Sequence, residues 1–137
     1  PKYSLFERWV EDGLLDLVGQ EGVGCIPFSP LAQGMLTDKY LHGIPNDSRV
    51  AKGVGFLKES QLTPERLRQI GQLNDLAQAR GQSLAQMALA WILKDERVTS
   101  VLIGASRPAQ LLDSLRSLDN TRFDAAKLAQ IEAVLSA

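Results

Sequence analysis

The spacing of apolar residues predicts a helix near the start of the chain and a strand directly after it. Four leucine and valine residues within residues 12–20 follow helical spacing, and Gly22 stands where a helix ends. Residues 23–28 then form an apolar run that is too short for a core helix and runs into Ser29-Pro30, where the proline should end a ladder. This run predicts a short buried strand.

Two further helices are predicted in the middle of the chain. Thr63 can cap a helix that has Pro64 at its first position and ends at Gly81. Its apolar stripe consists of Leu67, Ile70, Leu73 and Ala77. Ser83 can cap the next helix, which ends near Asp95. The strongly apolar face of that helix consists of Leu84, Met87, Ala88, Trp91 and Ile92.

The last part of the chain repeats the strand and helix signals. Residues 98–105 are β-branched and almost continuously apolar, which is typical of a parallel strand buried on both faces. A helix is predicted from residues 106–108 through Leu115, and Asp124 can cap a final helix. The inward residues of that helix are expected to be Leu128, Ile131 and Leu135. Residues 41–62 show neither the helical nor the strand spacing of apolar residues, so they are either a long functional loop or a disordered segment.

The order of these elements indicates an α/β fold with a parallel sheet. Only two strands are predicted, and parallel strands that are buried on both faces need neighbours on both sides. Open sheet edges leave backbone groups unpaired. The chain therefore either pairs with another molecule or forms one piece of a larger sheet.

Composition narrows the range of partners. The 137 residues are 45% hydrophobic and 23% charged, and they carry a net charge of −1 with both signs interspersed. These values suit one domain or less and offer no basic surface for nucleic acid. We expect no membrane association and a cytoplasmic location, since no apolar run is long enough to span a bilayer and no signal sequence is present. Cys25 lies in an apolar run and is interpreted as buried packing.

Two segments carry motifs of a known family, residues 22–40 (GVGCIPFSPLAQGMLTDKY) and residues 98–111 (VTSVLIGASRPAQL). Both resemble the aldo-keto reductases, in the branch of potassium-channel β subunits and bacterial glyceraldehyde-phosphate reductases. The first segment is similar to the seventh strand and following loop of that branch, and the second is similar to its eighth strand and the start of its last barrel helix. Residues 43–45, 48–49 and 86–91 also match, so the resemblance covers essentially the whole chain.

The resemblance implies that NADPH binds through the loop after the first segment. In α/β barrels, phosphate sites commonly lie after the seventh and eighth strands, where helix N-termini offer free N–H groups. The implied cofactor-binding residues are Phe28, Ser29, Pro30, Leu31, Ala32, Gln33 and Gly34. Phe28 would lie against the nicotinamide ring, and the alternative is a buried core position. Lys39 and Arg49 match residues that reach the adenosine 2′-phosphate, and the alternative is solvated surface charge.

The second loop is implied to contact the adenosine end of the cofactor. The matching residues are Gly104, Ser106, Arg107, Gln110, Asp113 and Ser114. Ser106 is also expected to cap the helix that follows. Asp113 replaces the usual Glu, Ser114 replaces the usual Asn, and many family members have Arg in place of Gln110. Arg107 could supply the missing charge, but the preference for NADP over NAD stays open.

No catalytic residue is expected in this chain. The family uses a Tyr as proton donor, tuned by a Lys and an Asp, with a His that orients the substrate. All four belong to the first half of the family's sequence. Tyr3, Tyr40 and His42 lie outside that motif, and Tyr3 is interpreted as structural. No metal site is expected at His42, because other metal-type ligands are absent nearby.

A complete barrel of this type needs about 250 residues. We therefore expect residues 1–137 to be the C-terminal portion of a single (β/α)8 barrel, holding only its last strands and helices. The part with the catalytic residues would be absent. The parent protein would be an NADPH-dependent reductase of small aldehydes, and this chain alone would be inactive. The alternatives are a non-catalytic NADP-binding or half-barrel interaction module that could form homo-oligomers, and a generic α/β domain without a nucleotide site.

Overall fold

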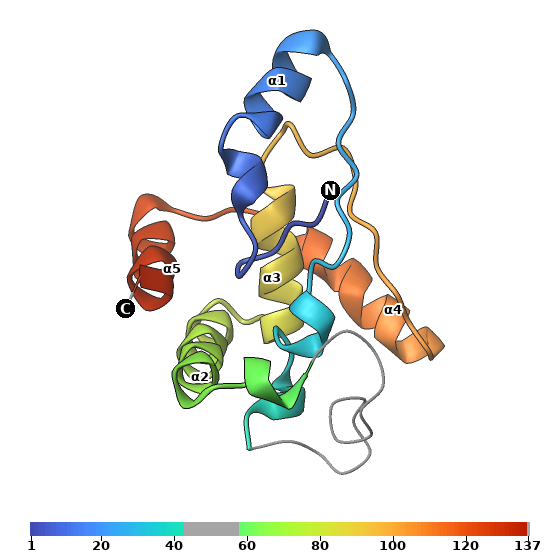
Figure 1. Cartoon of the computed structure of the whole chain (residues 1–137). Coiled ribbons are helices and arrows are strands. Elements are labelled where there is room, and N and C mark those ends of the chain that lie inside the picture. Colours follow the sequence, from blue (N-terminus) through green and yellow to red (C-terminus); the bar gives the residue numbers. More distant parts are fainter. Residues whose placement is uncertain (43–57, 137) are drawn as a thin grey trace.

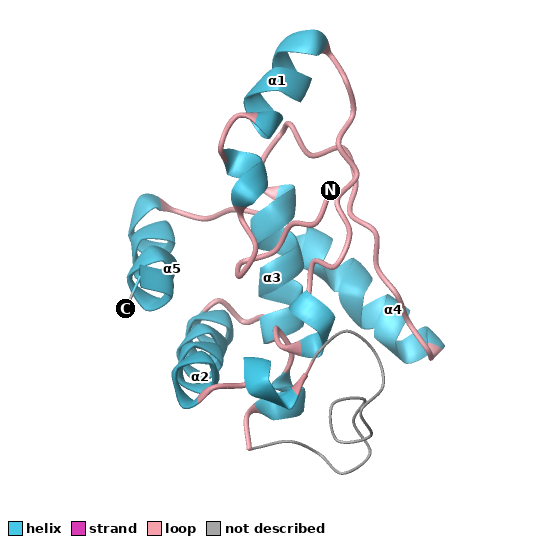
Figure 2. Cartoon of the chain, viewed as in Figure 1, coloured by secondary structure: helices cyan, strands magenta, loops and turns pink. Residues whose placement is uncertain are grey.

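The computed structural model describes residues 1–42 and 58–136, and Arg49 lies outside these residues. Every predicted helix is confirmed (Figures 1 and 2). The α-helices are α1 (Leu14–Glu21), α2 (Pro64–Ala79), α3 (Leu84–Leu93), α4 (Pro108–Leu115) and α5 (Ala125–Ser136). Short 3₁₀ helices are η1 (Trp9–Glu11), η2 (Ala32–Gly34), η3 (Asp38–Tyr40), η4 (Glu59–Gln61) and η5 (Arg116–Asp119).

Three of the helix starts are fixed by the predicted caps. Thr63 accepts a hydrogen bond from the Arg66 N–H at the start of α2. Ser83 and Gln86 form a reciprocal capping box at the start of α3. At α5, the Asp124 carboxylate accepts from the Lys127 N–H at 2.7 Å. These caps satisfy N–H groups that have no partner inside a helix.

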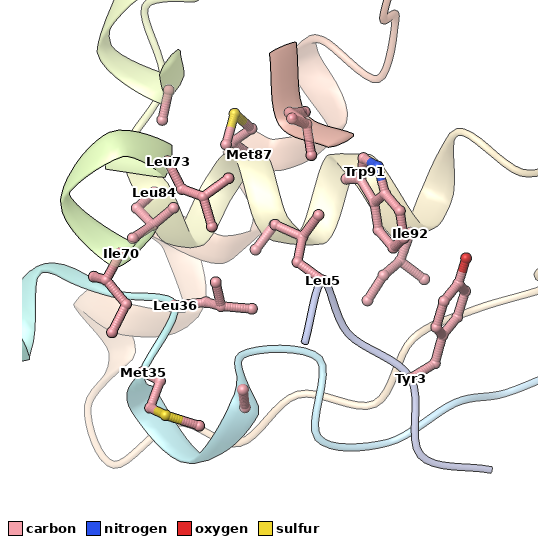
Figure 3. Packing of buried hydrophobic residues seen from close by; sticks show 14 of the residues in the cluster. Tyr3, Leu5, Met35, Leu36, Ile70, Leu73, Leu84, Met87, Trp91 and Ile92 are labelled. Carbon is pink, nitrogen blue, oxygen red and sulfur yellow. The ribbon is translucent and has the colours of Figure 1, made fainter. Parts of the chain in front are cut away.

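Helix α3 lies at the centre of the fold (Figure 1). Most of its buried residues belong to one core cluster with buried residues of α1, α2 and α5. It is buried well beyond the predicted face, because Leu89 and Ala90 are buried as well. Figure 3 shows the surrounding side chains of the N-terminal segment, the loop after residue 28 and α2. These include Tyr3, Leu5, Met35, Leu36, Ile70 and Leu73. The core therefore joins segments from both halves of the chain.

The two predicted strands are not formed in the described residues, which contain isolated bridges instead. The backbones of these segments nevertheless run side by side. The Thr99 N–H donates to the Cys25 carbonyl at 2.8 Å, and the Leu102 N–H donates to the Pro27 carbonyl at 3.0 Å. Because the donors and acceptors advance together, the two segments are parallel.

The N-terminal residues extend this arrangement on the other edge. The Phe28 N–H donates to the Pro1 carbonyl at 2.9 Å, and the Tyr3 N–H donates to the Phe28 carbonyl at 3.2 Å. Residues 25–28 thus lie between residues 1–3 and residues 99–102. Among the described residues, no other segment pairs with the outer edges, and a few bonds on one edge do not make a regular ladder. This explains why the strand prediction was wrong as a statement of secondary structure.

The expected burial of residues 98–105 was also wrong. Val98 is buried, but Leu102 is 56% exposed, and Val23 and Ile26 on the neighbouring segment are similarly exposed. Helix α4 has no buried residue. Its exposed apolar side chains, called the α4 leucines below, are Leu111, Leu112 and Leu115. The extended residues 98–105 and helix α4 therefore expose apolar side chains that no other described element covers.

Candidate functional site

The loop after Phe28 turns sharply in a strained conformation. Ser29, Ala32 and Gln33 have φ angles of 55°, 50° and 61°, and Gly34 has a φ of 91°. A non-glycine residue with such a φ costs about 1 kcal/mol or more, and this strain is concentrated at functional sites. Three such residues within five positions mark residues 29–34 as a candidate binding loop.

The same loop offers unpaired hydrogen-bond donors. The N–H groups of Ala32 and Gly34 donate to the carbonyls of Ser29 and Leu31. In the described part of the chain, the N–H groups of Ser29, Leu31 and Gln33 have no such partner. Consecutive N–H groups in a turn of mixed handedness form a concave site for an anion. The loop can therefore bind a phosphate oxygen with its backbone.

A threonine connects this loop to the predicted phosphate-binding lysine. The Thr37 hydroxyl donates to the Gly34 carbonyl at 2.6 Å and accepts from the Lys39 N–H at 3.2 Å. The Lys39 ammonium lies beside Gly34, since a Cβ on Gly34 would be 3.9 Å from Lys39 Nζ. The structure thus brings Lys39 and residues 29–34 together. Thr37 was missed in the sequence, although a Thr before Asp38-Lys39-Tyr40 is a typical helix cap.

The second loop ends in the first turn of α4. The prediction that Ser106 caps this helix was wrong, because Arg107 occupies the N-cap position without a side-chain cap hydrogen bond. Ser106 lies one residue earlier, and its N–H and hydroxyl donate to Gln110 Oε1 at 2.8 and 3.0 Å. Gln110 reaches back in this way because it is the third residue of the helix, where a long amide can meet the preceding turn.

Exposed donors and a positive charge remain at this helix start. Gly104, Ser106, Arg107 and Gln110 are all exposed. Among the described residues, the N–H groups of Arg107 and Ala109 have no hydrogen-bond partner. The N-terminus of a helix also carries a partial positive charge. Arg107 and the first turn of α4 together form a second position at which an anion can bind.

Asp113 and Ser114 lie further along α4 and are half-buried. The Gln86 side-chain amide donates to the Asp113 carboxylate at 2.9 Å and to its carbonyl at 3.2 Å. Asp113 is therefore held against α3, and one of its two carboxylate oxygens already accepts a hydrogen bond from Gln86. Gln86 is a further residue that the sequence did not single out for the site, and its role could not be found without the packing of α3 on α4.

The parallel segments bring the two loops to the same end of the fold. Residues 25–27 and 99–102 run alongside each other (light blue and orange in Figure 1), and the two segments then lead into their loops. Phe28 at the end of the first segment is 47% exposed, as are its neighbours Val23 and Ile26 at 57% and 50%. An aromatic ring, a strained loop and a helix N-terminus therefore follow the ends of adjacent parallel segments.

Tyr3 is the described tyrosine nearest the start of the chain, and it is engaged in the core. Tyr3 is 1% exposed, its hydroxyl donates to Glu11, and its ring packs at 5.5 Å against Trp91. The structural interpretation of Tyr3 is confirmed. The described part of the chain contains no group of three His, Cys, Asp or Glu that could hold a metal ion. Nor does it contain a helix with the length and apolarity to cross a membrane.

Comparison with known proteins places this arrangement in a family. The sequence profile of the Aldo/keto reductase family matches residues 1–136. The chain belongs to the aldo/keto reductase family. The resemblance of residues 22–40 and 98–111 is thereby confirmed, and the family is one of (β/α)8 barrels.

Two groups of relatives match the expected branch of the aldo/keto reductases. L-glyceraldehyde 3-phosphate reductase of Escherichia coli K12 is 54% identical over 96% of this chain and 39% of its own length. A probable voltage-gated potassium channel β subunit of Oryza sativa subsp. japonica is 40% identical over 87% of this chain and 37% of its own length. The chain thus spans about two fifths of the length of these curated relatives.

Proposed function

We propose that this aldo/keto reductase chain forms the C-terminal portion of a (β/α)8 barrel and binds the phosphate groups of NADPH. The observation that carries the proposal is the shared end of the parallel segments 25–28 and 99–102. Both segments lead into loops with unpaired N–H groups and a nearby cation, Lys39 in one and Arg107 in the other. Phosphate sites of α/β barrels lie in the corresponding loops.

The residues present fit a dinucleotide cofactor. The donors of residues 29–34 suit a pyrophosphate, Lys39 suits a 2′-phosphate, and the exposed face of Phe28 suits the nicotinamide ring. Arg49, outside the described residues, is proposed as a second 2′-phosphate contact. Gly104, Ser106, Arg107 and Gln110 would hold the adenosine end, with Asp113 and Ser114 supporting it. Bound NADPH would supply the hydride that reduces a carbonyl.

The proposed reaction of the whole protein is the reduction of a small aldehyde with a phosphorylated or hydroxylated carbon chain. The name of the Escherichia coli relative supports this substrate class. The catalytic Asp, Tyr, Lys and His would belong to a part of the barrel before residue 1. A cytoplasmic location is proposed with it.

Cofactor binding can be measured through the two tryptophans, Trp9 and Trp91. We expect NADPH titration to change their fluorescence, and Lys39→Ala or Arg49→Ala to weaken NADP more than NAD, by about tenfold for a lost charge-assisted contact. Arg122→Ala is the matched control, because Arg122 is an exposed cation just before α5. An equal loss for both dinucleotides would contradict the 2′-phosphate assignment.

Catalysis is tested separately with the isolated chain. NADPH consumption is followed with glyceraldehyde and with methylglyoxal. We expect no turnover, because the catalytic groups are proposed to belong to another part of the protein. Measurable turnover by the 137 residues would overturn the assignment of the catalytic groups to another part of the protein.

A second candidate function is a half-barrel interaction module that pairs with a second copy of itself. The specific observation in its favour is α4, which has no buried residue and exposes the α4 leucines. Sedimentation velocity would then show a dimer that Leu112→Glu dissociates. Leu17→Glu, at an exposed leucine of α1, is the control and should leave the dimer intact. A monomer at all concentrations would exclude this candidate.

A further inference from the structure

A cavity of about 300 Å³ lies away from the two loops, between the N-terminal segment, α2 and α5. Its walls combine apolar side chains with charged and polar ones. Leu5, Phe6 and Leu135 provide the apolar part. The remaining lining residues are Arg8, Arg66, Gln69, Glu132 and Ser136. None of these residues belongs to the proposed cofactor site.

Arg66 is a cation without an anionic partner in this cavity. Its guanidinium lies over the Phe6 ring at 3.9 Å from the ring centroid. In the described part of the chain, it makes no ion pair and no side-chain hydrogen bond. It also stands in the first turn of α2, where the helix dipole disfavours a cation. Partial burial lowers the pKa of Arg66, with no carboxylate to oppose that effect.

The second guanidinium of the cavity, that of Arg8, already has carboxylate partners. Arg8 contacts Glu132 at 2.7 Å and Glu11 at 2.8 Å, so its guanidinium is already neutralised. Gln69 is also engaged, since its amide donates to the Val134 carbonyl at 3.3 Å and joins α2 to α5. Among the described lining residues, Arg66 is therefore the guanidinium that has no carboxylate partner, and it lies on the Phe6 ring.

We propose that this cavity binds a small monocarboxylate with an apolar body. The carboxylate pairs with the Arg66 guanidinium, whose planar fork matches two carboxylate oxygens. The body packs on Leu5, Phe6 and Leu135. One unpaired guanidinium compensates one negative charge, which favours a monocarboxylate over a phosphate monoester. The site is independent of the cofactor loops, so it does not rest on the function proposed above.

The test uses a matched pair of probes, hexanoate and hexanamide, which differ in charge but share the same body. Each is titrated into the chain at constant ionic strength, and the NMR signals of the Arg66 side-chain Nε–H and the Gln69 side-chain amide are followed. We expect saturable shifts with hexanoate and binding by hexanamide that is about tenfold weaker, the effect of one charge-assisted contact. Equal binding of both probes, or no saturable shift with hexanoate, would overturn the proposal.

Two variants locate the contact. Arg66→Gln should weaken hexanoate binding about tenfold and leave hexanamide binding unchanged. Arg68→Gln is the control, because Arg68 lies on the same helix and already pairs with Glu65. It should bind hexanoate like the parent chain. Circular dichroism verifies that both variants fold, and unaltered hexanoate binding by folded Arg66→Gln would contradict the site. The probe comparison in the parent chain stands even where a variant does not fold.

Discussion

Thr99 and Cys25 are joined by two hydrogen bonds across 74 residues of sequence. The Thr99 N–H donates to the Cys25 carbonyl at 2.8 Å, and Thr99 Oγ1 accepts from the Cys25 N–H at 3.0 Å. The side chain thus takes the place of a backbone acceptor that a regular ladder would supply. It also lies 3.0 Å from the position of a Cβ on Gly24, so the segments approach closely only because residue 24 is glycine.

Thr99→Val should destabilise the chain. The substitution keeps the shape of the side chain but removes the acceptor, and it leaves the Cys25 N–H without a partner. A lost hydrogen bond of this kind costs about 1–3 kcal/mol. The free energy of unfolding in urea measures the effect. Ser100→Ala is the control, because no described hydrogen bond uses the Ser100 hydroxyl. Equal stability of Thr99→Val and the parent chain would refute the role of Oγ1.

Alanine substitution should have opposite effects at two glycines. Gly34 has a φ of 91°, so Gly34→Ala strains the binding loop and should cost about 1–2 kcal/mol. Gly71 lies inside α2 with no atom within 4 Å of the position that a Cβ would take, so Gly71→Ala should stabilise by about 0.5–1 kcal/mol. Thermal unfolding of the two variants tests the pair, and effects of the same sign would contradict this account.

Gln86 should couple the start of α3 to α4. Gln86→Ala removes its half of the capping box and its hydrogen bonds to Asp113, whereas Ser83→Ala removes only the other half of the box. The expected losses are about 2 kcal/mol and about 1 kcal/mol. The double variant should lose less than the sum, because both residues serve one cap. Strict additivity in urea unfolding would show that the capping box does not act as a unit.

Glu11 should make stability depend on pH in the acid range. Burial raises its pKa, but hydrogen bonds from Arg8 and Tyr3 outweigh burial, and the pKa lies below its ordinary 4.5. A lowered folded-state pKa contributes stability above 4.5 that is lost as pH falls through the folded value. In Glu11→Gln, the free energy of unfolding should therefore fall less steeply with decreasing pH below 4.5 than in the parent chain. Asp12→Asn, an exposed neighbour, is the control and should retain the steep loss.

The helices were predictable from sequence because their signals are local. Thr63, Ser83 and Asp124 cap residues only three positions away, and the apolar stripe of α2 repeats within a few turns. The strands were not predictable in the same way, because a strand exists only with its neighbours. Residues 98–105 have the composition of a buried parallel strand, but the described chain offers them a partner on one edge alone.

The candidate site shows the same difference between local sequence signals and contacts made across the fold. The motif around Ser29 and Lys39 located a loop whose strained backbone and close lysine are present in the structure. The motif did not reveal that Thr37 joins them, or that Gln86 holds Asp113 from a different helix. The cap of α4 was predicted one residue too early, at Ser106, which Gln110 holds in the preceding turn. Contacts between separate elements depend on packing, which no single segment encodes.

The exposure of the α4 leucines bears on how long this chain would survive in a cell. Exposed apolar side chains on a helix are features by which chaperones and proteases distinguish incompletely folded proteins. A chain that leaves Leu111, Leu112 and Leu115 in water would be removed quickly, whereas one whose α4 is covered would persist. The lifetime of the chain in a cell would then show whether another segment or molecule covers α4.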